Sequence, residues 1–142
     1  DATSCVIRDR RVLLLGCVQS LYESAMYIFI FIWTPALEAT GSIPHGIIFS
    51  CFMVCCSLGG SVFSYLSTKH KVVVILQYVF LISALCLSVP MVTDNPMYLM
   101  PSFCVYEIMI GIFWPGIGTL RSEYLPEKHR TTIMNLYRVP LN

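Results

Sequence analysis

The chain of 142 residues is 56% hydrophobic and only 12% charged, whereas a typical soluble domain is about 25% charged. This composition argues against a soluble globular domain. A formal net charge of +1 gives no sign of a surface that binds nucleic acid, so no nucleic-acid partner is expected. We therefore expect an integral membrane protein.

Four long apolar stretches follow one another, at residues 12–37, 46–66, 72–92 and 98–120. A membrane-spanning helix needs about 20 apolar residues to cross a hydrocarbon core of about 30 Å, and each stretch is long enough. A soluble bundle of buried helices is the alternative, but segments such as 25–33 lack the polar face that it would require. The chain is therefore predicted to be an all-α membrane protein, a bundle of transmembrane helices.

Basic residues lie before the first stretch, between the second and third, and after the fourth, whereas the connections 38–45 and 93–97 contain none. They are Arg8, Arg10, Arg11, Lys69, Lys71, Arg121, Lys128 and Arg130. Because basic loops stay cytoplasmic, this pattern predicts a cytoplasmic N-terminus, with residues 1–11 as the end of a cytoplasmic linker. The chain then re-enters the membrane near Thr131 and begins a fifth helix, as a piece of a longer protein would.

Polar side chains occur in the middle of the first stretch. Glu23 lies about 16 Å into this stretch, near the midplane, at a rise of about 1.5 Å per residue. Gln19 and Tyr27, four residues to either side, are expected on the same face, and Phe29 and Ile30 on a face that contacts lipid. A charge at the bilayer centre costs at least about 2.5–3.5 kcal/mol, so such residues usually carry function. A structural ion pair or a protonated acid that holds helices together is the alternative.

The fourth stretch contains a second midplane acid, Glu107. Gly111, four residues further on, would permit close approach of another helix, and Pro115 would favour a kink. Trp114 is a candidate for a cavity wall or for ordinary packing. Arg138, a turn or two into the expected fifth helix, is the only deep cation.

The connections on the basic side contain candidate gate residues. The pair Gly59 and Gly60 would let a partner helix approach, with Gly60 as the gate candidate, and Lys69 follows in a very short turn. Arg121 and Glu123 end the fourth stretch, and Arg130 begins the next helix. Acid–base pairs at such positions can hold one state of an alternating-access cycle. The ordinary alternative is a solvated pair that contributes about 0–1 kcal/mol.

The seven cysteines and three histidines do not form a metal or catalytic pattern. All cysteines but Cys5 lie inside the apolar stretches, where small thiols pack well, and none has the closely spaced partners that zinc needs. We therefore expect no metal, no cofactor and no enzymatic activity.

Several motifs resemble the molybdate-anion transporter family of the major facilitator superfamily. Residues 11–23 and 33–37 resemble its seventh helix, 46–53 the start of its eighth, and 111–115 with 121–142 its tenth and eleventh. The inner-loop motif that is usual in this superfamily is incomplete here. Ser64 and Tyr65 stand at the positions of its acidic and basic residues, and Lys69 alone keeps the basic residues with which the motif ends. The resemblance implies a twelve-helix major facilitator fold in two halves. Residues 12–142 would be the transmembrane bundle of the C-terminal half, with four full helices and the start of a fifth.

The resemblance also implies a secondary-active carrier that imports molybdate, a tetrahedral oxyanion, by alternating access around a midplane site. Arg138 would bind the oxyanion, while Glu23 and Glu107 would carry protons or hold Arg138 until substrate arrives. The expected partners are the lipid bilayer, a molybdate-like oxyanion and the missing N-terminal half of the same chain. The expected location is the cell membrane, as a multi-pass protein. A non-transporting sensor or scaffold and a self-contained four-helix interaction protein remain alternatives.

Overall fold

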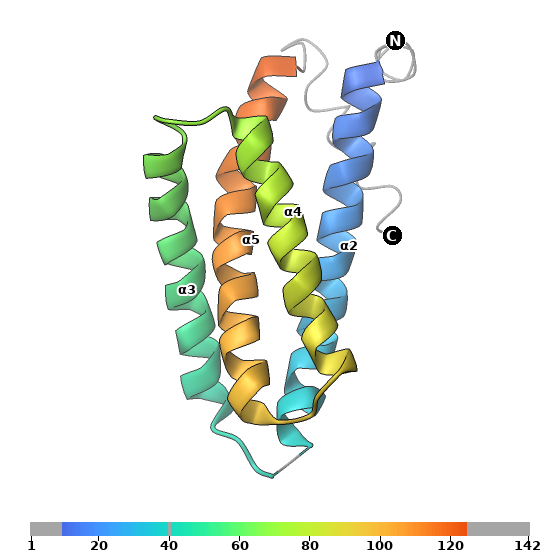
Figure 1. The fold of residues 1–142 in the computed structure, drawn as a ribbon, viewed down its shortest axis with the longest axis vertical. Helices are drawn as coiled ribbons and strands as arrows, with labels where there is room; N and C mark the ends of the chain where they lie inside the picture. The colour runs from blue at the N-terminus through green and yellow to red at the C-terminus, as the bar shows by residue number, and fades with distance from the viewer. Residues whose placement is uncertain (1–9, 40, 125–142) are drawn as a thin grey trace. The chain divides into compact units, whose positions relative to one another are not determined.

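A computed structural model describes residues 10–39 and 41–124, and these residues form helices and short connections without strands. The helices are α2 (Arg10–Glu38), α3 (His45–Leu66), α4 (Val72–Ser88) and α5 (Pro96–Tyr124), and the short 3-10 helix η1 (Val89–Met91) follows α4 (Figure 1). The first and last residues of each α-helix lie within a few residues of the bounds of the corresponding predicted stretch. The predicted all-α class is confirmed. Residues 1–9 of the predicted linker end and the whole of the predicted fifth helix lie outside the described residues, while Arg10 and Arg11 begin α2.

Four helices are long and apolar enough to cross a membrane: Arg10–Glu38, His45–Leu66, Val72–Met91 and Pro96–Tyr124. The connections between them are short and locally satisfied. Gly41 has a φ of 145°, which a glycine adopts without strain after α2. At the start of α5, the side-chain oxygen of Asn95 accepts a hydrogen bond of 3.0 Å from the backbone N–H of Met97.

The chain divides into two compact units. Of the described residues, 10–28 and 117–124 belong to the first unit, so this unit contains the start of α2 and the end of α5. Residues 29–116 form the second unit, with the remainder of α2, all of α3 and α4, and most of α5. Each unit is internally packed, and the candidate side chains are divided between them.

An aromatic cluster forms part of the core of the second unit. The ring of Phe29 in α2 lies 5.2 Å from Phe103 and 4.8 Å from Tyr106, both in α5, as measured between ring centroids. Phe52 of α3 lies 6.0 Å from Phe29 and 5.4 Å from Trp33. These spacings suit edge-to-face aromatic contacts, which add stabilisation beyond their buried area. Phe29 is only 3% exposed, so its expected placement against lipid is wrong.

Two glycines set the closest helix contact in this unit. A Cβ atom on Gly111 of α5 would stand 2.0 Å from the carbonyl oxygen of Cys56 in α3. A Cβ atom on Gly59 of α3 would stand 2.2 Å from the carbonyl oxygen of Ile108 in α5. The backbones of α3 and α5 therefore touch in a way that only glycine permits. The close approach expected at Gly111 and at the pair Gly59 and Gly60 is present, and within that pair Gly59 makes the contact.

Helix α4 packs on α5 through a side-chain hydrogen bond and a small-residue contact. The hydroxyl of Ser102 in α5 donates a hydrogen bond of 2.9 Å to the carbonyl of Cys86 near the end of α4. Leu76 of α4 is buried, and a Cβ atom on Gly116 of α5 would stand 2.9 Å from its Cδ2. Helix α5 continues through Pro115 to Tyr124, so this proline does not end the helix.

Candidate functional site

The buried polar and charged side chains of the described residues are Gln19, Ser20, Glu23, Ser83 and Glu107. Three of them belong to consecutive turns of α2 in the first unit. Gln19 and Glu23 are 6% and 8% exposed, and the side-chain amide of Gln19 donates a hydrogen bond of 2.7 Å to the Oε1 atom of Glu23. Residues four apart share a helix face, so sequence spacing alone brings these two groups together.

The Gln19–Glu23 pair is incompletely satisfied within the described part of the chain. Its amide donates to Glu23, but the Oε1 atom of Gln19 is buried and has no hydrogen-bond partner there. A buried acceptor without a donor costs about 1–3 kcal/mol. The neighbouring hydroxyl of Ser24 donates to the carbonyl of Ser20 at 2.8 Å, so it does not satisfy this acceptor. The Oε1 atom of Gln19 can therefore accept a hydrogen bond from one further donor.

Tyr27 does not share the burial of this pair, because its side chain is 57% exposed. Each step of four residues advances the helix by about 40° beyond a full turn, so Tyr27 lies about 80° from Gln19 around the axis. The buried side of α2 instead passes through Tyr22, which is 7% exposed, and Phe29. Alternating steps of three and four residues connect these positions, so the buried side of the helix does not follow a spacing of four.

Glu107 is 8% exposed and belongs to the second unit, near the middle of α5. The preceding residue, Tyr106, is fully buried, and the α3–α5 glycine contact follows one turn later at Gly111. Glu107 thus occupies a buried position of α5 one turn before the α3–α5 glycine contact.

Trp114 is 40% exposed, and its ring stands 5.5 Å from that of Phe113 at an interplanar angle of 68°. Phe113 is fully buried and anchors this pair of rings. Trp114 thus presents one side of its ring outward from the described unit. This placement is compatible with lipid contact, and equally with a cavity shared with another part of the protein.

The gate candidates are positioned as follows. Lys69 is exposed, its ammonium group lies 4.4 Å from the centre of the Tyr65 ring, and it donates a hydrogen bond to the Tyr65 hydroxyl. Gly60 has ordinary room, since a Cβ atom would stand 4.0 Å from the carbonyl oxygen of Gly111. Arg121 is half-buried and Glu123 is exposed.

Arg130 and Arg138 lie outside the described residues, so their candidate roles remain predictions. Among the described residues, no group of three or more His, Cys, Asp or Glu side chains could hold a metal ion. The described thiols are all free, and most are exposed or half-buried on the helices.

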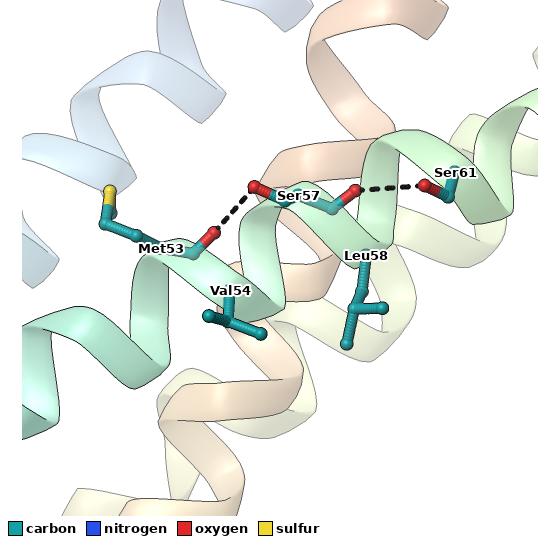
Figure 2. A pocket seen from close by; sticks show the side chains of 5 residues that line it. All are labelled: Met53, Val54, Ser57, Leu58 and Ser61. Atoms are coloured by element: carbon teal, nitrogen blue, oxygen red, sulfur yellow. Dashed lines mark hydrogen bonds between the residues drawn. The ribbon is translucent and has the colours of Figure 1, made fainter.

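One face of α3 carries serine hydroxyls that form hydrogen bonds within the helix and do not form a polar binding site. A hollow of about 320 Å³ lies on this face, and Figure 2 shows the side chains that line it, which are Met53, Val54, Ser57, Leu58 and Ser61. The hydroxyl of Ser57 donates to the carbonyl of Met53 at 2.9 Å, and that of Ser61 to the carbonyl of Ser57 at 3.4 Å. Because the hydroxyls bond within their own helix, this face offers a largely apolar surface.

These helices define the protein first as a polytopic α-helical membrane protein. The chain matches over residues 1–114 the major facilitator (MFS) family described as sugar transporters with 12 TM. It belongs to this family. The family description disfavours the alternative of a self-contained four-helix protein, and the predicted membership of the major facilitator superfamily is confirmed.

Curated relatives bear a more particular name. The molybdate-anion transporter of Xenopus laevis is 38% identical in an alignment 156 residues long, and this alignment covers 100% of this chain and 33% of that protein. Those of Takifugu rubripes and Danio rerio are 35% and 33% identical over 150 residues, each covering 100% of this chain and 31% of the relative. The chain thus spans about a third of the length of these relatives, which are named as transporters and not as enzymes. No solved structure matches the chain.

Proposed function

We propose that this chain is part of a secondary-active carrier that moves a tetrahedral oxyanion of the molybdate class by alternating access. The observation that carries the proposal is the buried Gln19–Glu23 pair inside a membrane-spanning helix, joined at 2.7 Å. Ionisable groups at such depth are costly and are retained where they serve transport. The relatives named molybdate-anion transporter support the choice of substrate.

The proposed division of roles follows from charge. Glu23 and Glu107 would repel a dianion when ionised, so we assign them to carrying protons or to holding a cation between transport events. Arg138 is the proposed anion contact, because its planar guanidinium can bond two oxyanion oxygens at once. Gln19, Tyr27 and Trp114 are proposed to line the substrate or coupling pathway. The N-terminal half of a twelve-helix protein would complete the site.

The acids are tested by uptake of molybdate into cells that produce the full-length protein. Glu23→Gln and Glu107→Gln should each lower molybdate uptake by about tenfold or more. A tenfold ratio corresponds to about 1.4 kcal/mol of free energy. Surface abundance of each variant should stay near that of the wild type. Glu38→Gln removes an exposed acid that pairs with His45 at 2.8 Å, and it serves as the matched control. Wild-type uptake by both midplane variants at every pH tested would refute the proton-carrier role.

Arg138 is tested by a graded series. Uptake should fall from arginine to lysine to alanine, because lysine keeps the charge and loses the planar fork, and alanine loses both. If Arg138→Ala instead disappears from the membrane and is rescued by also neutralising Glu23 or Glu107, the arginine is a structural ion-pair partner. Normal uptake in Arg138→Ala would exclude both roles.

A neutral, hydroxyl-rich solute is a second candidate substrate. Within the described residues, the buried polar set consists of carboxylates, an amide and hydroxyls, without lysine or arginine. Such groups accept and donate hydrogen bonds to sugar hydroxyls, and the family is described as sugar transporters. Competition separates the candidates: excess sulfate or tungstate should block molybdate uptake, and hexoses should not. Saturable uptake of a hexose, together with no saturable uptake of molybdate, would favour the sugar.

We propose the cell membrane as the location, with the N-terminus of this chain in the cytoplasm. Glycosylation acceptors inserted at residues 41–44 and 94–95 should be modified, whereas thiols placed at Lys69, Lys71 and Lys128 should react only from the cytoplasmic side. In that orientation Gly60, Lys69, Arg121, Glu123 and Arg130 would form the inner gate. Labelling of position 70 from outside would overturn the orientation and the gate together.

A further inference from the structure

A groove on the second unit lies between α3 and α4, over α5, with a volume of about 320 Å³. Its lining is apolar except near one end. Val62 and Leu66 of α3, Val74 and Ile82 of α4, and Ile112 of α5 line it, and His70 of the α3–α4 turn lies at its end. The groove is separate from the buried polar side chains considered above.

The end of this groove carries a cluster of basic groups. Lys69, His70 and Lys71 are consecutive and exposed in the turn between α3 and α4. No aspartate or glutamate occurs in the sequence between Glu38 and Asp94, so no acid from α3, α4 or their turn neutralises the cluster. Lys69 is held over Tyr65 through its ring and hydroxyl, which fixes one ammonium group beside the turn.

The length of the groove suits one leaflet of a bilayer. From Val74 to Ile82 the helix advances about 12 Å at about 1.5 Å per residue, close to half of a hydrocarbon core of about 30 Å. The basic turn, which directly precedes the first residue of α4, then lies where lipid phosphates lie. Basic pockets between transmembrane helices favour anionic lipid headgroups.

We propose that the α3–α4 groove binds an anionic phospholipid, with one acyl chain along Val74 and Ile82 and the phosphate against Lys69, His70 and Lys71. The apolar lining selects an acyl chain, and the charge of the turn selects an anionic headgroup over a zwitterionic one. This site shares Lys69 with the proposed inner gate but does not involve the transported substrate, and its test needs no uptake measurement.

The first experiment measures retained lipid on the purified full-length protein by native mass spectrometry. Phosphatidylglycerol and phosphatidylcholine with identical acyl chains are supplied in equal amounts. The wild type should retain phosphatidylglycerol preferentially, and Lys69→Gln/Lys71→Gln should lower that preference by about fivefold for each charge removed. Arg8→Gln/Arg10→Gln removes two charges predicted to lie on the same membrane side and should leave the preference unchanged.

The second experiment tests the acyl-chain part with adjacent positions on α4. Val74 lines the groove and is 39% exposed, whereas Val73 is 44% exposed and does not line it. Val74→Trp should abolish retention of phosphatidylglycerol, and Val73→Trp should not. Equal retention of both lipids by the wild type, or an unchanged preference in the double lysine variant, overturns the headgroup assignment. If Val74→Trp retains lipid, or if the wild type retains none because another helix fills the groove, the site does not exist.

Discussion

Helices α3 and α5 contrast in a way that reverses the rule for soluble proteins. The mean hydropathy of the α3 span is 2.0 and that of the α5 span is 1.5. Of the 18 residues over which each hydropathy is averaged, however, 17% are buried in α3 and 56% in α5. The more apolar helix is thus the more exposed one. Helix α5 contains Glu107, Gly111 and Gly116, while the exposed face of α3 carries aliphatic side chains and internally bonded serines.

The reason lies in the solvent. Lipid tails are as apolar as leucine, so there is no hydrophobic driving force that sends the most apolar helix to the centre of a bundle. Close backbone contact and satisfied polar groups decide which helix becomes central. Gly59 and Gly111 supply the close contact, and α5 gains buried surface through it. Within the described residues, Gly59, Gly111 and Glu107 therefore mark the interior, whereas the serines of α3 that bond within their own helix do not.

The largest expected effect comes from breaking the α3–α5 glycine contact. Gly59→Ala would place a Cβ atom 2.2 Å from the backbone oxygen of Ile108, which cannot rotate away. We expect a loss of about 3 kcal/mol or more in the free energy of unfolding, measured by thermal unfolding in detergent with a thiol-reactive dye. Gly60→Ala is the control, because its Cβ atom has ordinary room and alanine favours the helix. Equal stability of the two variants would remove the glycine contact as the cause of α5 burial.

The next effect concerns the polar pair of α2. Gln19→Leu would leave Glu23 buried without the amide that donates to it at 2.7 Å, at a cost of about 1–3 kcal/mol in the free energy of unfolding. Glu23→Gln combined with Gln19→Leu should cost less than the sum of the single changes, which a double-mutant cycle by thermal unfolding measures. Leu21→Ala, at a position 72% exposed, is the control on the same helix. Additive effects would mean that the two side chains do not interact energetically.

A smaller effect is expected at Gly116. A Cβ atom there would stand 2.9 Å from Cδ2 of Leu76, the end of a flexible side chain that can adjust. Gly116→Ala should therefore cost about 1 kcal/mol in the same unfolding measurement. Shortening the neighbour in Gly116→Ala/Leu76→Val should recover part of the loss. A cost as large as that of Gly59→Ala would show that side-chain and backbone neighbours are equally unyielding here.

The smallest effect is expected on the exposed face of α3. Ser57→Ala and Ser61→Ala remove hydroxyls that bond only to carbonyls of their own helix. We expect changes within about 0.5 kcal/mol in unfolding and unchanged uptake. A marked loss of uptake with normal abundance would place a polar surface of the transporter on α3, against the apolar role inferred from its burial.

Much of the candidate site could be predicted because its rules are local. The proximity of Gln19 and Glu23 follows from a spacing of four, and the close approach at Gly111 follows from the lack of a side chain. Tyr27 and Phe29 show where local rules stop. Both are aromatic and lie two residues apart, yet one is 57% exposed and the other 3%. Repeated steps of four drift around the helix, and only the neighbours that cover α2 reveal which side is buried.

The sequence by itself determined that the helices are long enough to span a membrane and where they begin and end, because length and hydropathy govern insertion segment by segment. It also predicted the orientation from its basic residues. Only the tertiary structure decided which glycine of the pair Gly59 and Gly60 touches α5, and that a groove opens between α3 and α4. A helix with apolar side chains on all sides has no polar face by which its sequence would distinguish the side that contacts lipid from the side that contacts protein. Which side faces inward therefore depends on how closely the helices can pack.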